Sequence, residues 1–163
     1  MDYLVIVEFI NDTRGEGTMV RRLAGYEPYK GEINQRSNGA LISTENGSAM
    51  TYALWNIQER GQLFITPQTE VYTGMIIGRA AKDMDMDVNP IKNKKMTAVR
   101  SSGADEAMKL VPAKILSLEE ALEFINDDEL VELTPDSIRL RKRYLTALER
   151  KQYNRNIAKN DEE

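Results

Sequence analysis

The stretch between residues 82 and 107 most constrains how this chain folds, because it interrupts the regular pattern on either side. It has no convincing apolar period, apart from a candidate short strand over 96–99. In a compact domain, an irregular run of this length is usually either functional or disordered. We therefore expect two regular portions joined by one long loop.

The portion before this loop predicts short strands around one amphipathic helix. β-Branched and apolar residues indicate strands over 40–43, 63–66 and 71–79, where Gly74 and Gly78 suggest bends or a bulge. The dipeptide Asn46-Gly47 is typical of a tight turn. Ser48 is the expected cap of the helix that follows, and Gly61 its expected end. Its buried stripe has helical spacing and consists of Met50, Ala53, Leu54 and Ile57.

The portion after the loop predicts two helices separated by a strand. Ser117 and Glu120 have the spacing of a capping box, which starts a helix with Leu118, Leu122 and Ile125 on one face. Alternation over 129–133 indicates a strand, and Thr134-Pro135 predicts the start of a longer helix that runs to about residue 154. We expect an α+β fold: a mostly antiparallel sheet or small barrel with two to four helices and one long basic loop.

Composition excludes several classes of protein. The 163 residues contain no cysteine and no histidine, which removes disulfides, thiolate metal sites and the usual general base of hydrolases. No apolar stretch approaches the roughly 20 residues that cross a bilayer, and the first residues lack the plan of a signal peptide. We therefore expect a cytoplasmic protein without membrane contact, and we expect it to be monomeric.

Charge is segregated along the chain, although its net value is −4. The long loop carries the cations Lys92, Lys94, Lys95 and Arg100, and the tripeptide 101–103 adds two hydroxyls and a glycine. These groups suit phosphates and 2′-hydroxyls, so the pattern favours a nucleic acid. RNA fits better than DNA, because no helix-turn-helix or zinc finger is visible. The alternative is a non-catalytic protein-interaction or structural module, in which the loop is disordered and its lysines only keep it soluble.

Two other charged stretches are candidates for a functional role. In the expected last helix, Arg139, Lys142, Arg143 and Arg150 fall on one face and form a positive stripe, for which a phosphate backbone and plain solvation are the two explanations. The alternating acids over 83–87 invite comparison with a calcium loop. That comparison fails, because Val88 stands where the turn needs glycine and Lys94 where the loop needs glutamate. We expect these acids to pair with the lysines just downstream.

Seven blocks of the sequence carry a resemblance to a known family. They are DTRGEG, GYEPYKGEI, NGALIS, ALWNIQERGQLFITPQTEVYTGMIIG, VRSSGADEAMKL, LSLEEALEFINDDELVELTP and SIRLRKRYL. From about residue 13 to 144 the chain resembles the C-terminal portion of the TypA/BipA translational GTPases. The resemblance implies three parts: 1–31 as the remnant of a ferredoxin-like domain similar to elongation factor G domain five, 32–153 as the family's special C-terminal domain, and 154–163 as a polar, disordered tail. It makes residues 1–12 helical, whereas Val5, Ile6 and Val7 locally favour a strand.

The resemblance also implies a function. GTP and magnesium would belong to the parent's N-terminal GTPase domain, so we expect this fragment to be no enzyme and to hold no cofactor. The parent would be a ribosome-binding factor in ribosome assembly and stress adaptation, and the loop would contact large-subunit ribosomal RNA and A-site transfer RNA. Ala98 departs from the family pattern, in which asparagine is common. The candidate RNA-binding residues are Lys92, Lys94, Lys95, Thr97, Arg100, Ser101, Ser102, Gly103, Asp105, Arg139, Arg141, Lys142 and Arg143.

Overall fold

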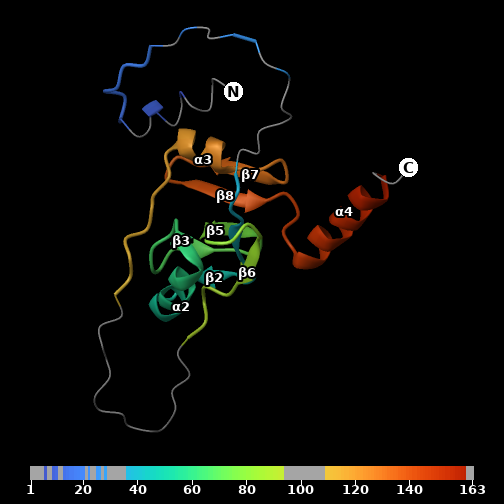
Figure 1. Ribbon diagram of the computed structural model, residues 1–163. Coiled ribbons are helices and arrows are strands. Elements are labelled where there is room, and N and C mark those ends of the chain that lie inside the picture. The colour runs from blue at the N-terminus through green and yellow to red at the C-terminus, as the bar shows by residue number, and fades with distance from the viewer. Residues whose placement is uncertain are drawn as a thin grey trace.

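The fold is an open α+β arrangement in a computed structural model that describes residues 6, 9–10, 13–20, 22, 25–26, 28, 36–93 and 109–160 (Figure 1). Six strands form one sheet in the order β6-β1-β5-β8-β7, with β3 also paired to β5, and β2 and β4 form a small second sheet. The elements are β1 (Ala40–Ser43), β2 (Gly47–Ser48), α2 (Thr51–Ile57), the 3-10 turn η1 (Gln58–Arg60), β3 (Gly61–Leu63), β4 (Glu70–Val71), β5 (Met75–Ala80), β6 (Met86–Val88), α3 (Leu118–Phe124), β7 (Glu129–Leu133), β8 (Ile138–Lys142) and α4 (Ala147–Asn160).

The expected class is confirmed, with an open sheet rather than a barrel in the described part of the chain. All pairings in the large sheet are antiparallel except β1 with β6. β5 lies at the centre because its residues are almost all buried, as a strand covered on both faces requires. On one edge β5 pairs with β1. On its other edge β3 pairs with residues 78–80 and β8 with residues 75–76.

One face of the sheet is covered by α2. Leu54 and Ile57 are buried against Leu41, Ile77 and other core residues, and Ala53 is buried as well, so the expected stripe is confirmed within the helix. Its fourth member, Met50, is half-buried and precedes the helix. The expected cap is wrong: Ser48 lies in β2, and the helix begins after Met50 without a side-chain cap. Gly74, between β4 and β5, has a φ of +86°, and a Cβ there would lie 2.7 Å from the Leu145 Cα.

The opposite face is covered by α3. Ala121 is fully buried there against Ile42, Ile76 and Leu140, and Phe124 packs edge-to-face on Phe64 with ring centroids 5.1 Å apart. The expected apolar face is therefore rotated, since Leu122 is 54% exposed. This exposure follows because α3 contacts the sheet through the small Ala121, which allows close approach.

The capping box of α3 is confirmed. The Glu120 amide donates to the Ser117 Oγ at 3.2 Å, and the Ser117 amide donates to the Glu120 Oε2 at 2.9 Å. The hydrogen bond from the Ser117 amide lowers the pKa of Glu120 against the opposing effect of burial, with help from Lys114. We expect Ser117→Ala to lower the free energy of unfolding by about 1 kcal/mol, measured by urea titration. Ser48→Ala is the matched control, because Ser48 caps nothing, and an equal loss in both variants would contradict this account.

The second half of the chain contains the main error of the sequence-based prediction. Residues expected at the start of a long helix form strand β8, which is antiparallel to β7 with Leu130 opposite Arg141 and Glu132 opposite Arg139. Thr134 caps a turn instead of a helix: its Oγ1 accepts a hydrogen bond from the Ser137 amide at 3.0 Å. The last helix, α4, begins only at Ala147, and it projects away from the sheet in Figure 1.

The strand expected around residues 5–7 is also wrong where the structure describes it. Ile6, Phe9 and Ile10 are helical, and the Thr13 amide donates to the Phe9 carbonyl at 3.0 Å. The local preference of β-branched residues is weak and context decides it. No helix in the described ranges combines the length and apolar character that crossing a membrane requires.

Candidate RNA-binding surface

The two stems of the basic loop are fixed to opposite ends of α2. At the start of the helix, the Met50 amide donates to the Pro90 carbonyl at 2.9 Å. After its end, Gln58 donates to the Lys109 carbonyl at 3.1 Å and accepts from the Val111 amide at 3.0 Å. The described residues on either side of this segment are thus both held by one short, well-packed helix.

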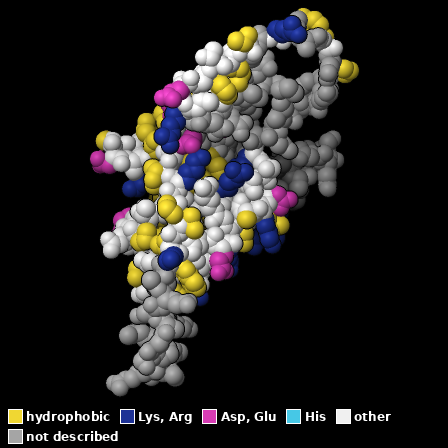
Figure 2. Space-filling model, turned by 60° about the vertical axis from the view of Figure 1, so that its left-hand side comes forward, with side chains coloured by type: hydrophobic (Ala, Val, Ile, Leu, Met, Phe, Trp, Pro, Cys, Tyr) yellow, Lys and Arg dark blue, Asp and Glu magenta, His cyan; other side chains and the backbone are white. Residues whose placement is uncertain are grey.

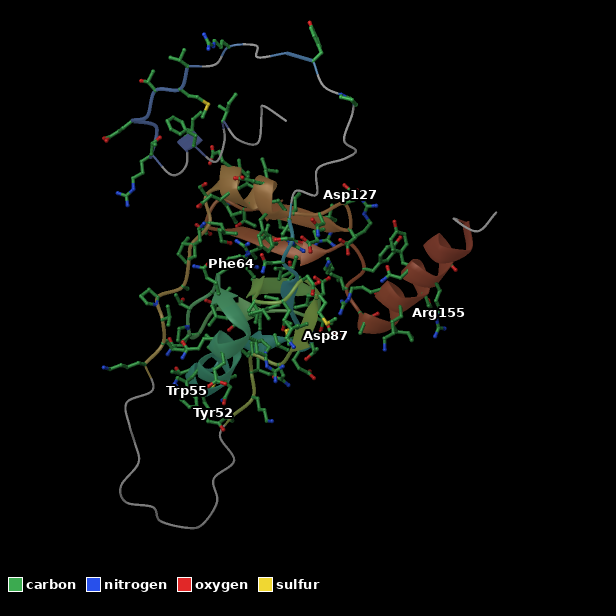
Figure 3. The ribbon with its side chains drawn as sticks, viewed as in Figure 1. Tyr52, Trp55, Phe64, Asp87, Asp127 and Arg155 are labelled. Atoms are coloured by element: carbon green, nitrogen blue, oxygen red, sulfur yellow. The ribbon has the colours of Figure 1, made fainter. Side chains whose placement is uncertain are left out.

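Apolar contacts reinforce both stems. Ile91 and Leu110, one on each stem, are partly buried and pack against the core beneath α2. Lys92 and Lys109, their neighbours in the chain, are exposed. The arrangement therefore buries the apolar residue of each stem and leaves its lysine in water. Tyr52 and Trp55 of α2 lie near these stems in Figure 3.

Most of the predicted loop residues fall outside the described residues. Only Lys92 among them is described, and it is exposed. Lys94, Lys95, Thr97, Arg100, Ser101, Ser102, Gly103 and Asp105 all lie in the range 94–108, and their RNA-binding role stays a prediction.

Three cations of the expected helical stripe, Arg139, Lys142 and Arg143, lie instead on or beside β8 together with Arg141, where side chains alternate between the two faces. The fourth, Arg150, lies in α4. Arg139 and Arg141 share one face, and the Arg141 Nε lies 2.7 Å from the Glu132 Oε1. Lys142 points to the other face and is buried, while Arg143 is exposed just after the strand. A single positive stripe over these residues is therefore wrong, because a strand turns neighbouring side chains to opposite faces.

Lys142 is the centre of an ion-pair cluster that the sequence did not predict. Its Nζ lies 2.6 Å from the Asp85 Oδ2, 2.8 Å from the Asp128 Oδ2 and 2.8 Å from the Glu129 Oε1. Burial acts to lower the pKa of Lys142, but the hydrogen bonds to these three carboxylates outweigh it and the pKa is raised. Carboxylates thus enclose this ammonium group, which leaves it no open side toward a phosphate.

Arg36 completes the cluster. It donates to both Glu129 oxygens at 2.8 Å, and its guanidinium carbon lies 4.3 Å from the centre of the Phe124 ring. Glu129 has a fully buried side chain, as a paired charge allows. Burial acts to raise the pKa of Asp85, but bonds from Lys142 and the Ala40 amide, with the charge of Arg36, leave it lowered. In the sequence, this cluster is indicated only by the three adjacent acids at 127–129 and by the cation-rich segment at 139–143.

Two of the three acids over 83–87 have partners other than those expected. Asp85 pairs with Lys142 and Arg36, and Asp87 pairs with Arg150 of α4. The described residues contain no group of three or more acids placed to hold a metal ion. The acids therefore join the sheet to later elements of the chain.

A second feature is an apolar cleft of about 550 Å³ between β8 with the turn before it and the segment 64–69 that follows β3. Phe64, Ile76 and Leu140 are among its lining residues, and Ile115 and Leu133 at the same cleft are 71% and 65% exposed. Figure 2 shows no continuous field of cations on the described part of the face it presents, where Lys and Arg lie among hydrophobic and uncharged side chains.

The fold and these anchors define a class of protein: an open α+β domain in which one helix fixes both stems of a basic segment. The model of the TypA/BipA C-terminal domain matches residues 38–147, so the chain belongs to this family.

Similar proteins are named large ribosomal subunit assembly factor BipA. Over 149 residues the chain is 52% identical to that of Buchnera aphidicola subsp. Schizaphis graminum, 49% to that of Salmonella typhimurium and 48% to that of Escherichia coli K12. These matches cover 91% of this chain but 24% of each relative. The chain therefore spans about a quarter of their length.

Proposed function

We propose that this chain is the ribosome-binding C-terminal region of a large-subunit assembly factor, and that its basic loop contacts ribosomal RNA and the acceptor end of A-site transfer RNA. The observation that carries the proposal is the attachment of both loop stems to α2, beside exposed Lys92 and Lys109. A segment rich in cations gains from rigid stems because fixed ends reduce the chain entropy lost on binding. The names of the relatives support the ribosome as partner.

The chemistry of the loop favours RNA phosphates as its ligands. Lys92, Lys94, Lys95 and Arg100 would neutralise phosphates, and the hydroxyls of Thr97, Ser101 and Ser102 would contact sugars. Gly103 would let the backbone approach closely, and Asp105 can accept from a 2′-hydroxyl. GTP hydrolysis would belong to the rest of the parent protein, which would act in the cytoplasm in ribosome assembly and stress adaptation.

A second candidate function is protein interaction without RNA contact. The apolar cleft beside β8 favours it, because Ile115 and Leu133 leave large apolar surface in water beside an apolar hollow. Such a surface is typical of a protein-binding site. Protein binding at this cleft would not require the cations of the loop.

Salt dependence distinguishes the two functions. We expect the 163-residue chain to bind purified 50S subunits with a log-log slope of affinity against salt of about −3 or steeper, since four phosphate contacts contribute roughly 0.7 to 0.9 each. The measurement is an equilibrium co-sedimentation titration between about 50 and 200 mM potassium chloride. Binding with a slope near zero would favour the apolar cleft, and no binding would contradict the proposed function.

A further inference from the structure

Helix α2 carries two aromatic side chains on the side that faces away from the core. At about 3.6 residues per turn, Tyr52 and Trp55 lie opposite the buried stripe of Ala53, Leu54 and Ile57. Both are partly exposed, and neither belongs to the two apolar clusters of the described core. Core packing therefore does not account for this pair, which we call the aromatic pair.

The two rings are neighbours on a backbone that is held in place. Residues three positions apart on a helix have their Cβ atoms about 5–6 Å apart, so the rings can act together. The other side of α2 is buried, and the Asn56 side chain donates to the Tyr52 carbonyl at 2.7 Å. Within the part of the chain that the structure describes, neither ring stacks on another aromatic ring or lies under a cation.

Exposed lysines lie beyond both ends of the aromatic pair. The hydrogen bonds that attach the stems to the two ends of α2 place the pair between Lys92 on one stem and Lys109 on the other. Among the described residues, neither lysine side chain has an ion-pair partner. Glu59 is the one acid between residues 49 and 60, and exposed Arg60 follows it. Figure 3 shows Tyr52 and Trp55 on the side of the domain where the stems lie.

We propose that the aromatic pair is a stacking platform for unpaired bases of an RNA strand whose phosphates contact the neighbouring lysines. Proteins bind single-stranded nucleic acid by combining aromatic rings with cations, because each base has a π face and each linkage a phosphate. A duplex keeps its bases stacked on one another, so the ligand is a single-stranded segment. This platform rests on the proposed function and deepens it by naming unpaired nucleotides as what α2 binds. An apolar segment of a ribosomal protein is the competing partner.

Trp55 supplies the first measurement, because it is the one tryptophan of the chain and its fluorescence reports on this site alone. The probes are a single-stranded oligoadenylate of about 12 nucleotides and a blunt RNA duplex of the same length. We expect the single strand to quench the fluorescence of the unaltered chain in a saturable way. The duplex should leave it nearly unchanged at the same nucleotide concentration.

The second measurement uses the variant Tyr52→Leu/Trp55→Leu in the full 163-residue chain. We expect its affinity for labelled oligoadenylate and for 50S subunits to fall on the order of tenfold, because stacking on the rings is lost. The slope of log affinity against log salt should stay at the wild-type value, since no charge is removed.

Two further variants are the controls. Tyr52→Phe/Trp55→Phe keeps both rings and should retain most of the affinity. Tyr144→Leu/Tyr153→Leu removes a different pair of stacked rings, at α4, and should leave both affinities unchanged. Circular dichroism verifies the helices of each variant.

Each outcome decides the proposal. No quenching by the single strand, equal quenching by the duplex, or an unchanged affinity of the leucine variant for oligoadenylate would overturn the platform. A loss with 50S subunits but not with oligoadenylate would overturn it in favour of a ribosomal protein. The quenching experiment uses the unaltered chain, so it decides even if the leucine variant is unstable. Quenching by the single strand without any binding to 50S subunits would support the platform and overturn the proposed function.

Discussion

Replacement of Lys92, Lys94, Lys95 and Arg100 by alanine is expected to weaken binding to 50S subunits on the order of 100-fold at about 0.1 M salt. The physical reason is counterion release: each cation that contacts a phosphate frees condensed counterions from the RNA, and each lost contact removes this favourable contribution. The slope of log affinity against log salt should fall by about 3, because four contacts at roughly 0.7 to 0.9 each are removed. Co-sedimentation across a salt series measures both quantities.

This loss should occur without a change in stability. Lys92 is exposed and makes no hydrogen bond or ion pair within the described residues, and the stems depend on Ile91, Leu110 and Gln58 instead. Thermal unfolding should therefore agree with the wild type within about 0.5 kcal/mol. The control variant replaces Arg22, Arg60 and Lys82, which are exposed on other parts of the chain. A similar loss per charge in the control would show that only net charge matters, and unchanged binding in the loop variant would remove the loop from the proposed function.

The sequence predicted those elements whose apolar period and local signals agree. In α3, the capping box and the apolar residues point to the same helix, and the structure confirms its start at Ser117. In α2, the stripe at 53, 54 and 57 is buried as expected. Strand β7 alternates, and β1 is a short β-branched and apolar run. These elements were predictable because their local signals, such as caps, agree with the pattern of apolar residues that the core requires.

The error at β8 has a physical cause. Its residues alternate, with Ile138, Leu140 and Lys142 toward one face, but this alternation is hidden because a lysine occupies a buried position. Lysine is almost never fully buried unless it is paired, so a pattern of hydrophobicity counts it as exposed. The helix-start signal of Thr134-Pro135 then favoured a helix. The burial of Lys142 depends on acids distant in sequence, which local patterns do not reveal.

The candidate site was predictable only in part. The cation cluster of the loop is visible in the sequence, and the family resemblance located it. The attachment of both stems to α2 was not predictable, because Gln58 contacts Lys109 and Val111 across a long stretch of chain. The same holds for the Asp87 contact that fixes α4. Such long-range polar contacts depend on the finished fold.

Substitution of Lys142 by methionine is expected to lower the free energy of unfolding by about 3 kcal/mol at neutral pH. Methionine has a similar length and no charge, so the change removes the ammonium group and little volume. Glu129 is fully buried and would keep only Arg36 as its charged partner. The carboxylates of Asp85 and Asp128 would lie near that of Glu129 without the ammonium group between them. Urea unfolding of the variant and the wild type gives the difference.

The pH dependence of that difference tests its electrostatic origin. The pKa of Asp85 is lowered from 3.8 in the folded protein, so its stabilising effect is present above pH 4 or so and is lost as the pH falls through the lowered folded pKa. The gap between wild type and Lys142→Met should therefore shrink in acid. Because Glu129→Gln removes the buried charge that Lys142 balances, the double variant should recover part of the loss. A gap that is constant with pH, with no recovery in the double variant, would mean that packing of the lysine stem, and not its charge, holds β7 and β8 to the sheet.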